Sequence, residues 1–384
     1  MPAIVHVFDD SGGWEQRVAA SQLLDRLPSD RFPQSLAAIH PIPDTLRRGL
    51  DRPIVLCAAR IGLTFTAAPA LRTFQEKRHA EVIHAWGVRA AIAAVAAGAK
   101  LLVVELFDPG EAVRGVKQLR TLARARNFAV VCSCEIVRRR LIEGGLPPDA
   151  TVVIRPGVDL GRINAARRGG LRESLGLRPD QHVVLSNAPL HRDGGQFDTA
   201  SALTLLSHFQ TNLALILPSE FCERGANAGR DQREKDRIIR FVRSMPQRPA
   251  LVTPPDTVPY EELVAASDTL VAAPRGDAPT TAIAWAMGAK TAVLGSAVHC
   301  VAELIANKVN GRLFKQTPGK SMATTIARLL RDRSSYNALT EAAHGQAYEI
   351  FSVRRYVDQH VRLYENLRNG VTPAEGIVDS SRVA

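Results

Sequence analysis

Acidic and hydroxyl side chains stand in a segment otherwise made mostly of small and apolar residues. Residues 278–314 read APTTAIAWAMGAKTAVLGSAVHCVAELIANKVNGRLF; Asp277 precedes them, Thr280 and Thr281 lie near the start, and Glu303 lies ahead of an Asn-Gly turn. Hydroxyl and N–H groups at a helix start bind phosphate oxygens, and a carboxylate accepts hydrogen bonds from the hydroxyl groups of a ligand. Either these residues form such a ligand site, or Asp277, Thr280 and Thr281 only cap a helix.

A second candidate for anion binding lies near the N-terminus. Gly12 and Gly13 follow two aspartates and Ser11, directly before a stretch with helical spacing. A glycine loop at that junction leaves backbone N–H groups open to an anion. The alternative is a tight turn that serves only the passage from strand to helix.

Short apolar, β-branched runs alternate with helical stretches along the chain. Apolar strands separated by helices are typical of parallel sheets covered on both faces. Helical spacing is clearest over Gln16–Leu27, Thr121–Phe128 and Glu135–Glu143. The expected strands are Ala3–Phe8, Ile54–Cys57, Val82–His84, Leu101–Glu105, Ala129–Ser133, Thr151–Ile154, Val183–Ser186, Leu213–Leu217, Leu251–Thr253, Thr269–Ala272 and Thr291–Leu294.

Length and composition indicate a soluble protein with two cores. The chain has 384 residues, of which 46% are hydrophobic and 23% charged, and it is too long for one typical domain. Neither a membrane span nor a secretion signal is apparent. Five scattered cysteines fit reduced thiols, so we expect a cytoplasmic protein with no disulfide framework and no metal site.

Positive charge is concentrated in one part of the chain. The net charge is +11, and residues 111–180 hold fourteen Lys and Arg against seven Asp and Glu. Such a patch faces either nucleotide phosphates, an anionic membrane or nucleic acid, or it is a solvated surface. Aromatic residues make up only 5% and are not interleaved with the arginines, so we expect no nucleic-acid partner. Peripheral contact with the inner face of a membrane remains a prediction.

Several segments, in order along the chain, resemble one family. They are Ser11–Val18 with its double glycine, Glu81–Gly87, Cys132–Leu141 with Gly145, Val153–Asp159, Leu171–Leu177, and the C-terminal FSVRR and LYENL pieces. Together they resemble the GT-B fold glycosyltransferases of family 4, from about residue 3 to residue 368.

The resemblance implies a two-domain architecture. We expect two doubly wound, Rossmann-like parallel-sheet domains facing a cleft, the first over residues 1–165 and the second over 175–350. A helix at about 353–369 would cross back and pack on the first domain. The tail, residues 370–384, has no pattern and is expected to be disordered.

The resemblance also implies an activity. The second domain would hold a nucleotide-diphosphate sugar and the first an acceptor, and the sugar would be transferred with retention at the anomeric carbon. The family needs no metal, and no cofactor is expected beyond the nucleotide-sugar substrate. Its members neutralise the leaving diphosphate with a basic pair and helix N-terminal N–H groups.

The sequence departs from the family at the basic pair. Gly194 stands in the place of the family's lysine, and Pro189 lies near the place of its arginine. Arg192, two residues from Gly194, has a side chain long enough to reach a phosphate. The alternative is that Arg192 is a loop charge beside Asp193.

Two further departures concern the sugar and the acceptor. The family's paired glutamates fall at Arg275 and Ile283, which leaves Asp277 as the nearby acid for the sugar contact. The family's histidine pair becomes His84 and Trp86, which share one face of a strand. His84 is either catalytic or a core histidine, and the Trp86 ring either stacks on a sugar or plugs the cleft.

Glu303 matches an acidic position of the family, where the family contacts the sugar, although it can also act as a helix cap. Two functions therefore stay open. One is an active sugar transferase that uses His84 and Asp277 in catalysis and Arg192, Thr280 and Thr281 for the diphosphate. The other is a catalytically inactive homologue that binds a partner or scaffold through the same cleft.

Overall fold

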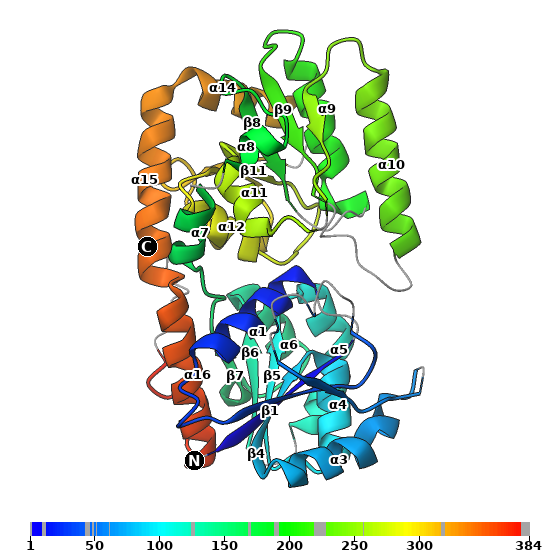
Figure 1. Ribbon diagram of the computed structural model, residues 1–384. Coiled ribbons are helices and arrows are strands. Elements are labelled where there is room, and N and C mark those ends of the chain that lie inside the picture. Colours follow the sequence, from blue (N-terminus) through cyan, green and yellow to red (C-terminus); the bar gives the residue numbers. More distant parts are fainter. Residues whose placement is uncertain are drawn as a thin grey trace. The chain divides into compact units, whose positions relative to one another are not determined.

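The chain folds into two compact units (Figure 1). The computed structural model describes residues 2–9, 13–42, 47, 50, 52–60, 62–123, 127–167, 170–187, 192–218, 228–255, 257–315 and 319–377. Unit 1 runs from Met1 to Gly157 and resumes at Val353, and unit 2 runs from Val158 to Ser352. Unit 1 is therefore discontinuous in sequence.

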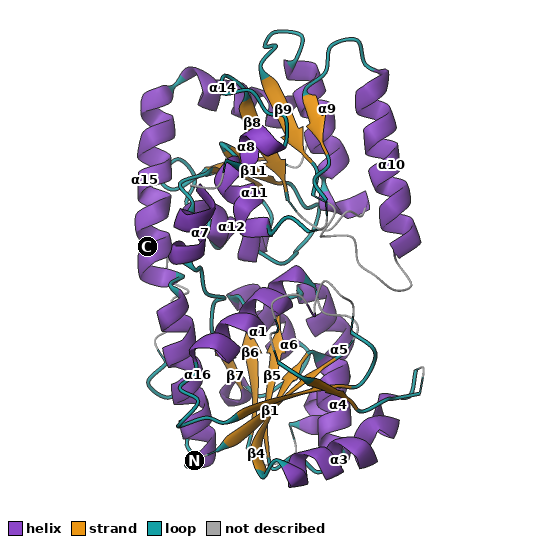
Figure 2. Ribbon diagram, in the orientation of Figure 1, coloured by secondary structure: helices purple, strands orange, loops and turns teal. Residues whose placement is uncertain are grey.

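Unit 1 is built on a sheet whose strands all pair in parallel, in the order β3-β2-β1-β4-β5-β6-β7 (Figure 2). The strands are β1 Ala3–Phe8, β2 Gln34–Ala38, β3 Ile54–Leu56, β4 Ala80–Trp86, β5 Leu101–Leu106, β6 Phe128–Cys132 and β7 Thr151–Val153. The helices are α1 Trp14–Arg26, α3 Ala68–Lys77, α4 Val88–Ala96, α5 Pro109–Leu122, α6 Glu135–Glu143 and α16 Val353–Arg368, with 3₁₀ turns η1 Thr64–Ala67 and η2 Pro148–Ala150.

Helix α16, which follows unit 2 in sequence, contributes side chains to the core of unit 1. Every residue of β5 is buried, as expected for a central parallel strand. Helix α16 places Tyr356, Leu363 and Tyr364 in the same hydrophobic cluster as Ile4 of β1. The last helix that the structure describes is thus part of the first core.

Unit 2 repeats the plan with the parallel strand order β10-β9-β8-β11-β12-β13. Its strands are β8 His182–Ser186, β9 Leu213–Ile216, β10 Ala250–Val252, β11 Thr269–Ala272, β12 Ala292–Ser296 and β13 Arg312–Phe314. Its helices are α7 Leu160–Arg167, α8 Leu171–Ser174, α9 Gln196–Leu206, α10 Ala228–Ser244, α11 Tyr260–Ala266, α12 Thr281–Gly288, α13 His299–Ala302, α14 Lys320–Arg331 and α15 Arg333–Ile350, with the 3₁₀ turn η3 Arg192–Gly194.

Two doubly wound parallel-sheet domains are the predicted fold class, which is confirmed. The helix predicted over Thr121–Phe128 is wrong, because α5 ends at Leu122 and Phe128 already belongs to β6. Strands β2 and β13 were not predicted. The helix expected at about 353–369 is α16.

The segment after α16 continues beyond the predicted start of the disordered tail. Residues 370–377 form turns, and Ala374 and Ile377 pack against the core of unit 1. The Asn366 side-chain amide donates to the carbonyl of Glu375 at 2.9 Å. Residues 378–384 lie outside the described part of the chain.

Candidate functional site

Each sheet has one switch point, the place from which successive strands are added outward in opposite directions. In unit 2 the strands run outward from β8 to β10 on one side and from β11 to β13 on the other, so this point lies between β8 and β11. In unit 1 it lies between β1 and β4. Ligands of open α/β sheets bind at the carboxyl ends of the strands that flank such a point.

The turn after β8 lies tightly against the end of β11. Gly195 has φ +79°, and a Cβ on it would stand 1.9 Å from the carbonyl oxygen of Ala273. The Gln196 side chain, at the start of α9, donates to the Asn187 carbonyl at 3.2 Å. Only glycine fits this approach, which brings the N-terminus of α9 beside the β11–α12 loop.

The predicted phosphate-binding Arg192 lies in this turn. Its backbone begins η3, which ends at Gly194; its guanidinium lies outside the described side chains. The backbone N–H of Arg275 donates to the carbonyl of Asp193 at 2.8 Å, which fixes η3 to the loop after β11.

Arg275 stands at one of the expected glutamate positions, and its guanidinium forms an ion pair with a side chain of α9. Its guanidinium lies 3.1 Å from the Asp198 carboxylate, as a half-exposed ion pair. Ile283, at the other expected glutamate position, is buried in the interior of unit 2. Neither side chain offers a carboxylate to a sugar.

Asp277, predicted to be catalytic, is bound to the start of α13. Its Oδ1 accepts the N–H of Cys300 at 3.3 Å and lies 3.9 Å from Nδ1 of His299. The Ala278 N–H donates to the Cys300 sulfur at 3.2 Å. These contacts favour a capping role for Asp277, on α13 rather than on the predicted α12.

Thr280 and Thr281 lie at the start of α12, and both are buried. Thr280 occupies the N-cap position without a side-chain capping bond, so the capping alternative for this residue is not observed. Glu303 is half-buried at the C-terminal end of α13. A carboxylate at that end of a helix is unfavourable for the helix dipole, so its predicted capping role is not supported.

At the switch point of unit 1, Gly13 is exposed and stands at the N-cap of α1, whereas Gly12 lies outside the described residues. A Cβ on Gly87, after β4, would lie 3.0 Å from a Glu111 oxygen and 3.6 Å from Oδ2 of Asp9. Two acidic side chains therefore approach the same glycine.

Glu111 was not identified as a candidate site residue from the sequence. It accepts the Val88 N–H at 2.9 Å, and burial, with smaller contributions from Asp9 and Asp108, raises its pKa to about 7. The available signal was the pattern Asp108-Pro-Gly-Glu111: a capping residue followed three positions later by glutamate marks a helix start. Asp108 does cap α5, accepting the N–H groups of Gly110 and Glu111.

His84 and Trp86 do share a face of β4, but both side chains are buried on that face. Their rings stack with centroids 4.5 Å apart, and neither side chain has exposed surface. The Trp86 indole donates to His6 at 3.2 Å and stacks on Phe8. The predicted catalytic role of His84 and sugar contact of Trp86 are therefore not supported, because both rings are fully buried and α16 contacts His84 through Tyr364 and His360.

His84 belongs to a buried polar network with Glu105 and His360. Nε2 of both histidines lies 3.1 Å from Oε2 of Glu105, and the Tyr356 hydroxyl donates to Oε1 at 2.8 Å. The Tyr364 hydroxyl lies 2.7 Å from Nδ1 of His84. Within the described residues this is the one group with the ligand atoms and spacing for a metal ion, and mutual hydrogen bonds and ion pairing already account for its geometry.

The network shifts the pKa values of its members. Burial raises the pKa of Glu105, but the charge and hydrogen bond of His360 and the hydrogen bond of His84 outweigh it and lower that pKa to about 2. Burial lowers the pKa of His84, against the influence of Glu105, and lowers that of His6 well below its usual value.

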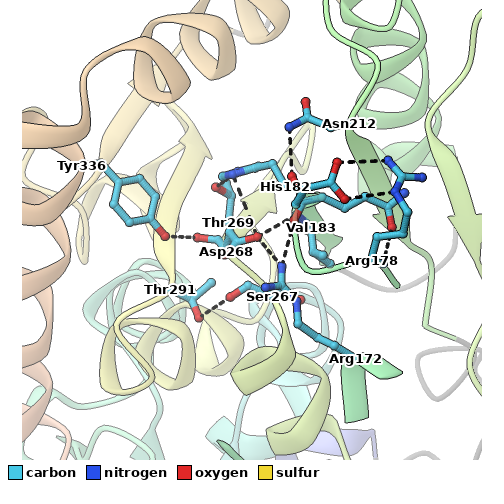
Figure 3. Close-up of polar contacts among 12 residues, drawn as sticks. Arg172, Arg178, His182, Val183, Asn212, Ser267, Asp268, Thr269, Thr291 and Tyr336 are labelled. Carbon is cyan, nitrogen blue, oxygen red and sulfur yellow. Dashed lines mark hydrogen bonds and ion pairs between the residues drawn. The ribbon is translucent and has the colours of Figure 1, made fainter. Parts of the chain in front are cut away.

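A second polar cluster lies at the opposite, amino-terminal edge of the unit 2 sheet (Figure 3). Arg172 and the Val183 N–H both bind Oδ2 of Asp268, at 2.6 and 2.8 Å. The Tyr336 hydroxyl donates to the Asp268 carbonyl at 2.7 Å. Because ligands of such sheets bind at the carboxyl edge, this cluster serves to fasten α8 and α15 to the sheet.

The basic span 111–180 is divided between the two units, and many of its arginines lie within 4 Å of a carboxylate. In the described part of the chain these are Arg114, Arg138, Arg140, Arg162, Arg172 and Arg178.

The sequence predicted reduced cysteines and no membrane span. Cys57, Cys132, Cys134 and Cys300 are buried thiols without a disulfide; Cys222 lies outside the described residues. Among the helices that are described, none has the length and hydropathy to cross a membrane.

No protein-family model matches the chain, and no curated protein sequence matches it either. Solved structures do resemble it over nearly their full length. HepE from Anabaena, solved with UDP and glucose, has a TM-score of 0.77 at 19% identity and covers 94% of this chain and 99% of its own. A glycosyltransferase from Rickettsia africae has a TM-score of 0.75 at 14% identity, over 96% and 98%.

Sucrose-phosphate synthase from Thermosynechococcus elongatus is similar to the same extent, with a TM-score of 0.73 at 15% identity over 96% of this chain and 100% of its own. The strand orders and these similarities give the chain the GT-B fold, as predicted.

Proposed function

We propose that the protein is a glycosyltransferase whose unit 2 binds a nucleotide-diphosphate sugar. The observation that carries this is the approach of Gly195 to Ala273, which places the start of α9 and the loop before α12 at one edge of the sheet, at its switch point. The HepE structures with UDP and with UDP-glucose support this ligand class, since that protein shares the fold.

The chemistry requires stabilisation of a leaving diphosphate. As the bond between the anomeric carbon and the phosphate oxygen breaks, negative charge accumulates on the diphosphate. Backbone N–H groups at the starts of α9 and α12, the hydroxyls of Thr280 and Thr281, and the guanidinium of Arg192 are the groups that we propose bind it.

Further features of the reaction are proposed from the sequence resemblance. These are membership of family 4, retention at the anomeric carbon, independence of metal ions and a cytoplasmic location. The acceptor is a hydroxyl of a glycan, a lipid or a small molecule bound by unit 1, where Gly13 and Glu111 lie at the switch point. We assign no reacting role to His84 or Trp86.

A second candidate is a catalytically inactive homologue that binds through the same edge. It is favoured by Ile283, which is buried where the resemblance places a carboxylate, and by Arg275, which is paired with Asp198. Donor binding without sugar transfer would distinguish this candidate from an active enzyme.

Thermal unfolding with UDP, GDP, ADP and their glucose conjugates, in the absence of divalent metal, tests the proposal. A nucleotide at a hundred times its dissociation constant stabilises the protein by about 2.7 kcal/mol. Arg192→Gln should weaken the shift, while Arg178→Gln, at the amino-terminal edge of the sheet, should not. No shift with any nucleotide would refute the transferase.

Contact of residues 111–180 with an anionic membrane was the remaining prediction. The carboxylates beside its arginines weigh against a membrane-binding face there.

A further inference from the structure

The loop that follows β12 carries an exposed histidine, His299. Its side chain is 76% exposed, whereas the next two residues, Cys300 and Val301, are buried. Strand β12 pairs in parallel with β11, so this loop stands at the carboxyl edge of the unit 2 sheet. The proposed donor site lies at the same edge.

Hydrogen bonds fix the backbone on both sides of His299. Before it, the Ala297 N–H donates to the carbonyl of Phe314 at 3.0 Å, which attaches the loop to the end of β13. After it, the Cys300 N–H donates to Oδ1 of Asp277 at 3.3 Å, which attaches the start of α13 to the loop after β11. The imidazole therefore projects from a fixed position.

The loop between β11 and α12 extends from the turn after β8 to His299. At its first residue, the carbonyl oxygen of Ala273 would stand 1.9 Å from a Cβ added to Gly195. Further along the same loop, Oδ1 of Asp277 lies 3.9 Å from Nδ1 of His299. Because the strand order is β8-β11-β12, the loops that follow these three strands are neighbours at the carboxyl edge.

The same loop leads directly into the start of α12. The Ala278 N–H donates to the sulfur of Cys300 at 3.2 Å, which holds this part of the loop against α13. Thr280 and Thr281, whose hydroxyls are among the groups proposed to bind the diphosphate, follow shortly after Ala278. Because His299 directly precedes Cys300, its imidazole is held close to the start of α12.

The two ring nitrogens of His299 have different surroundings. Nδ1 is the nitrogen nearer to Asp277, and the two groups form an ion pair when the ring is protonated. Nε2 makes no hydrogen bond within the part of the chain that the structure describes. An N–H group at this exposed nitrogen is a suitable donor to an anionic phosphate oxygen.

We propose that His299 donates a hydrogen bond from Nε2 to the diphosphate of the nucleotide sugar. This inference rests on the proposed transferase function and adds a side chain from the loop after β12 to its donor site. Gly194, which stands where the resemblance places a lysine, has no side chain to offer, and His299 provides a donor from a neighbouring loop. Its hydrogen bond strengthens as negative charge accumulates on the leaving diphosphate.

Calorimetric titration of purified variants with a nucleotide sugar tests this inference. The ligand is whichever of UDP-glucose, GDP-glucose and ADP-glucose stabilises the wild type in the thermal experiment. His299→Phe keeps a ring of similar size without a hydrogen-bond donor, and we expect it to raise the Kd about tenfold or more. His299→Arg restores N–H donors for a phosphate and should recover most of the lost affinity.

The matched control is His208→Phe, which removes an exposed imidazole between α9 and β9, at the amino-terminal edge of the same sheet, and should leave the Kd unchanged. Both histidines are exposed, so the thermal midpoints of the ligand-free variants should match that of the wild type.

The outcomes separate this inference from the proposed function. An unchanged Kd in His299→Phe, with binding by the wild type, would overturn the role of His299 and leave the donor site in place. Equal weakening in His299→Phe and His299→Arg would exclude hydrogen-bond donation to the diphosphate. Absence of binding by the wild type to all three nucleotide sugars would overturn both proposals.

Discussion

His360, near the end of the chain, lies 3.1 Å from the carboxylate of Glu105 in the middle of the first sheet, and neither side chain is exposed. The other ring nitrogen of His360 lies 2.9 Å from the carbonyl of Tyr356. Because carboxylate and carbonyl oxygens only accept hydrogen bonds, the ring donates from both nitrogens and carries the positive charge that balances Glu105. Helix α16 is thus attached to unit 1 by a buried ion pair.

Breaking this pair should destabilise the protein strongly. Glu105→Gln leaves the His360 charge buried without its counter-charge, and we expect a loss of about 3–5 kcal/mol in the free energy of unfolding of unit 1. The control on the same helix is Glu365→Gln, which breaks a half-exposed pair with Arg31 and should cost no more than about 1 kcal/mol. Urea unfolding measures both, and equal losses would contradict the buried ion pair.

Lowering the pH should reduce the stability of unit 1, because its buried histidines resist protonation in the folded state. Burial lowers the pKa values of His6 and His84 below 6.5, so the unfolded chain binds protons that the folded chain does not. Stability is then complete above about pH 6.5 and falls as the pH decreases below it. His84 is surrounded by Glu105, Tyr364, His360 and Trp86, and replacement by glutamine should flatten the pH dependence. An unchanged slope in His84→Gln would exclude this residue as a source.

Glu111 should act in the opposite direction. Its pKa is raised from 4.5 to about 7, so the folded state binds a proton between these values and loses stability as the pH rises through them. Glu111→Gln keeps an acceptor for the Val88 N–H and removes the buried charge. We expect it to raise the unfolding free energy by roughly 1–3 kcal/mol at pH 8 and by little at pH 5. The same gain at both pH values would show that ionisation is not the cause; Glu76→Gln, at an exposed site, is the control.

Gly195→Ala should disrupt the proposed donor site. Its Cβ would overlap the Ala273 carbonyl, and the residue would keep a left-handed backbone, so we expect a loss of about 3 kcal/mol or more in the stability of unit 2 and no nucleotide-induced thermal shift. Gly276→Ala, in the neighbouring loop, meets no atom within 4 Å and should change stability by less than about 1 kcal/mol. A nucleotide response that survives in Gly195→Ala would place the donor elsewhere.

The fold was predictable wherever a strand consists of apolar, β-branched residues. Ala3–Phe8 and Thr269–Ala272 were predicted with the bounds of β1 and β11, and Glu135–Glu143 with those of α6. Strand β2, Gln34–Ala38, was missed because its sequence QSLAA has no β-branched residue and is recognisable only by its pairing with β1.

The contacts of the proposed site residues could not be predicted from the sequence. A strand pattern places His84 and Trp86 on one face, yet it does not reveal that a helix almost 280 residues later covers that face. Asp277 was expected to be catalytic, with a cap on the following helix as the alternative, and only the folded loop shows that it binds the start of α13. Glu111 carries a local helix-start signal, while its raised pKa arises from burial that no local pattern contains.

The discontinuity of unit 1 has a consequence for biosynthesis. The ribosome completes all seven strands of the first sheet by residue 153, but Tyr356, His360 and Tyr364 emerge only after unit 2 has been made. Until then Glu105 and His84 lack the partners that their interior positions require. Unit 2, which is continuous from Val158 to Ser352, can fold before α16 is made, whereas the core of unit 1 is complete only once α16 has been synthesised.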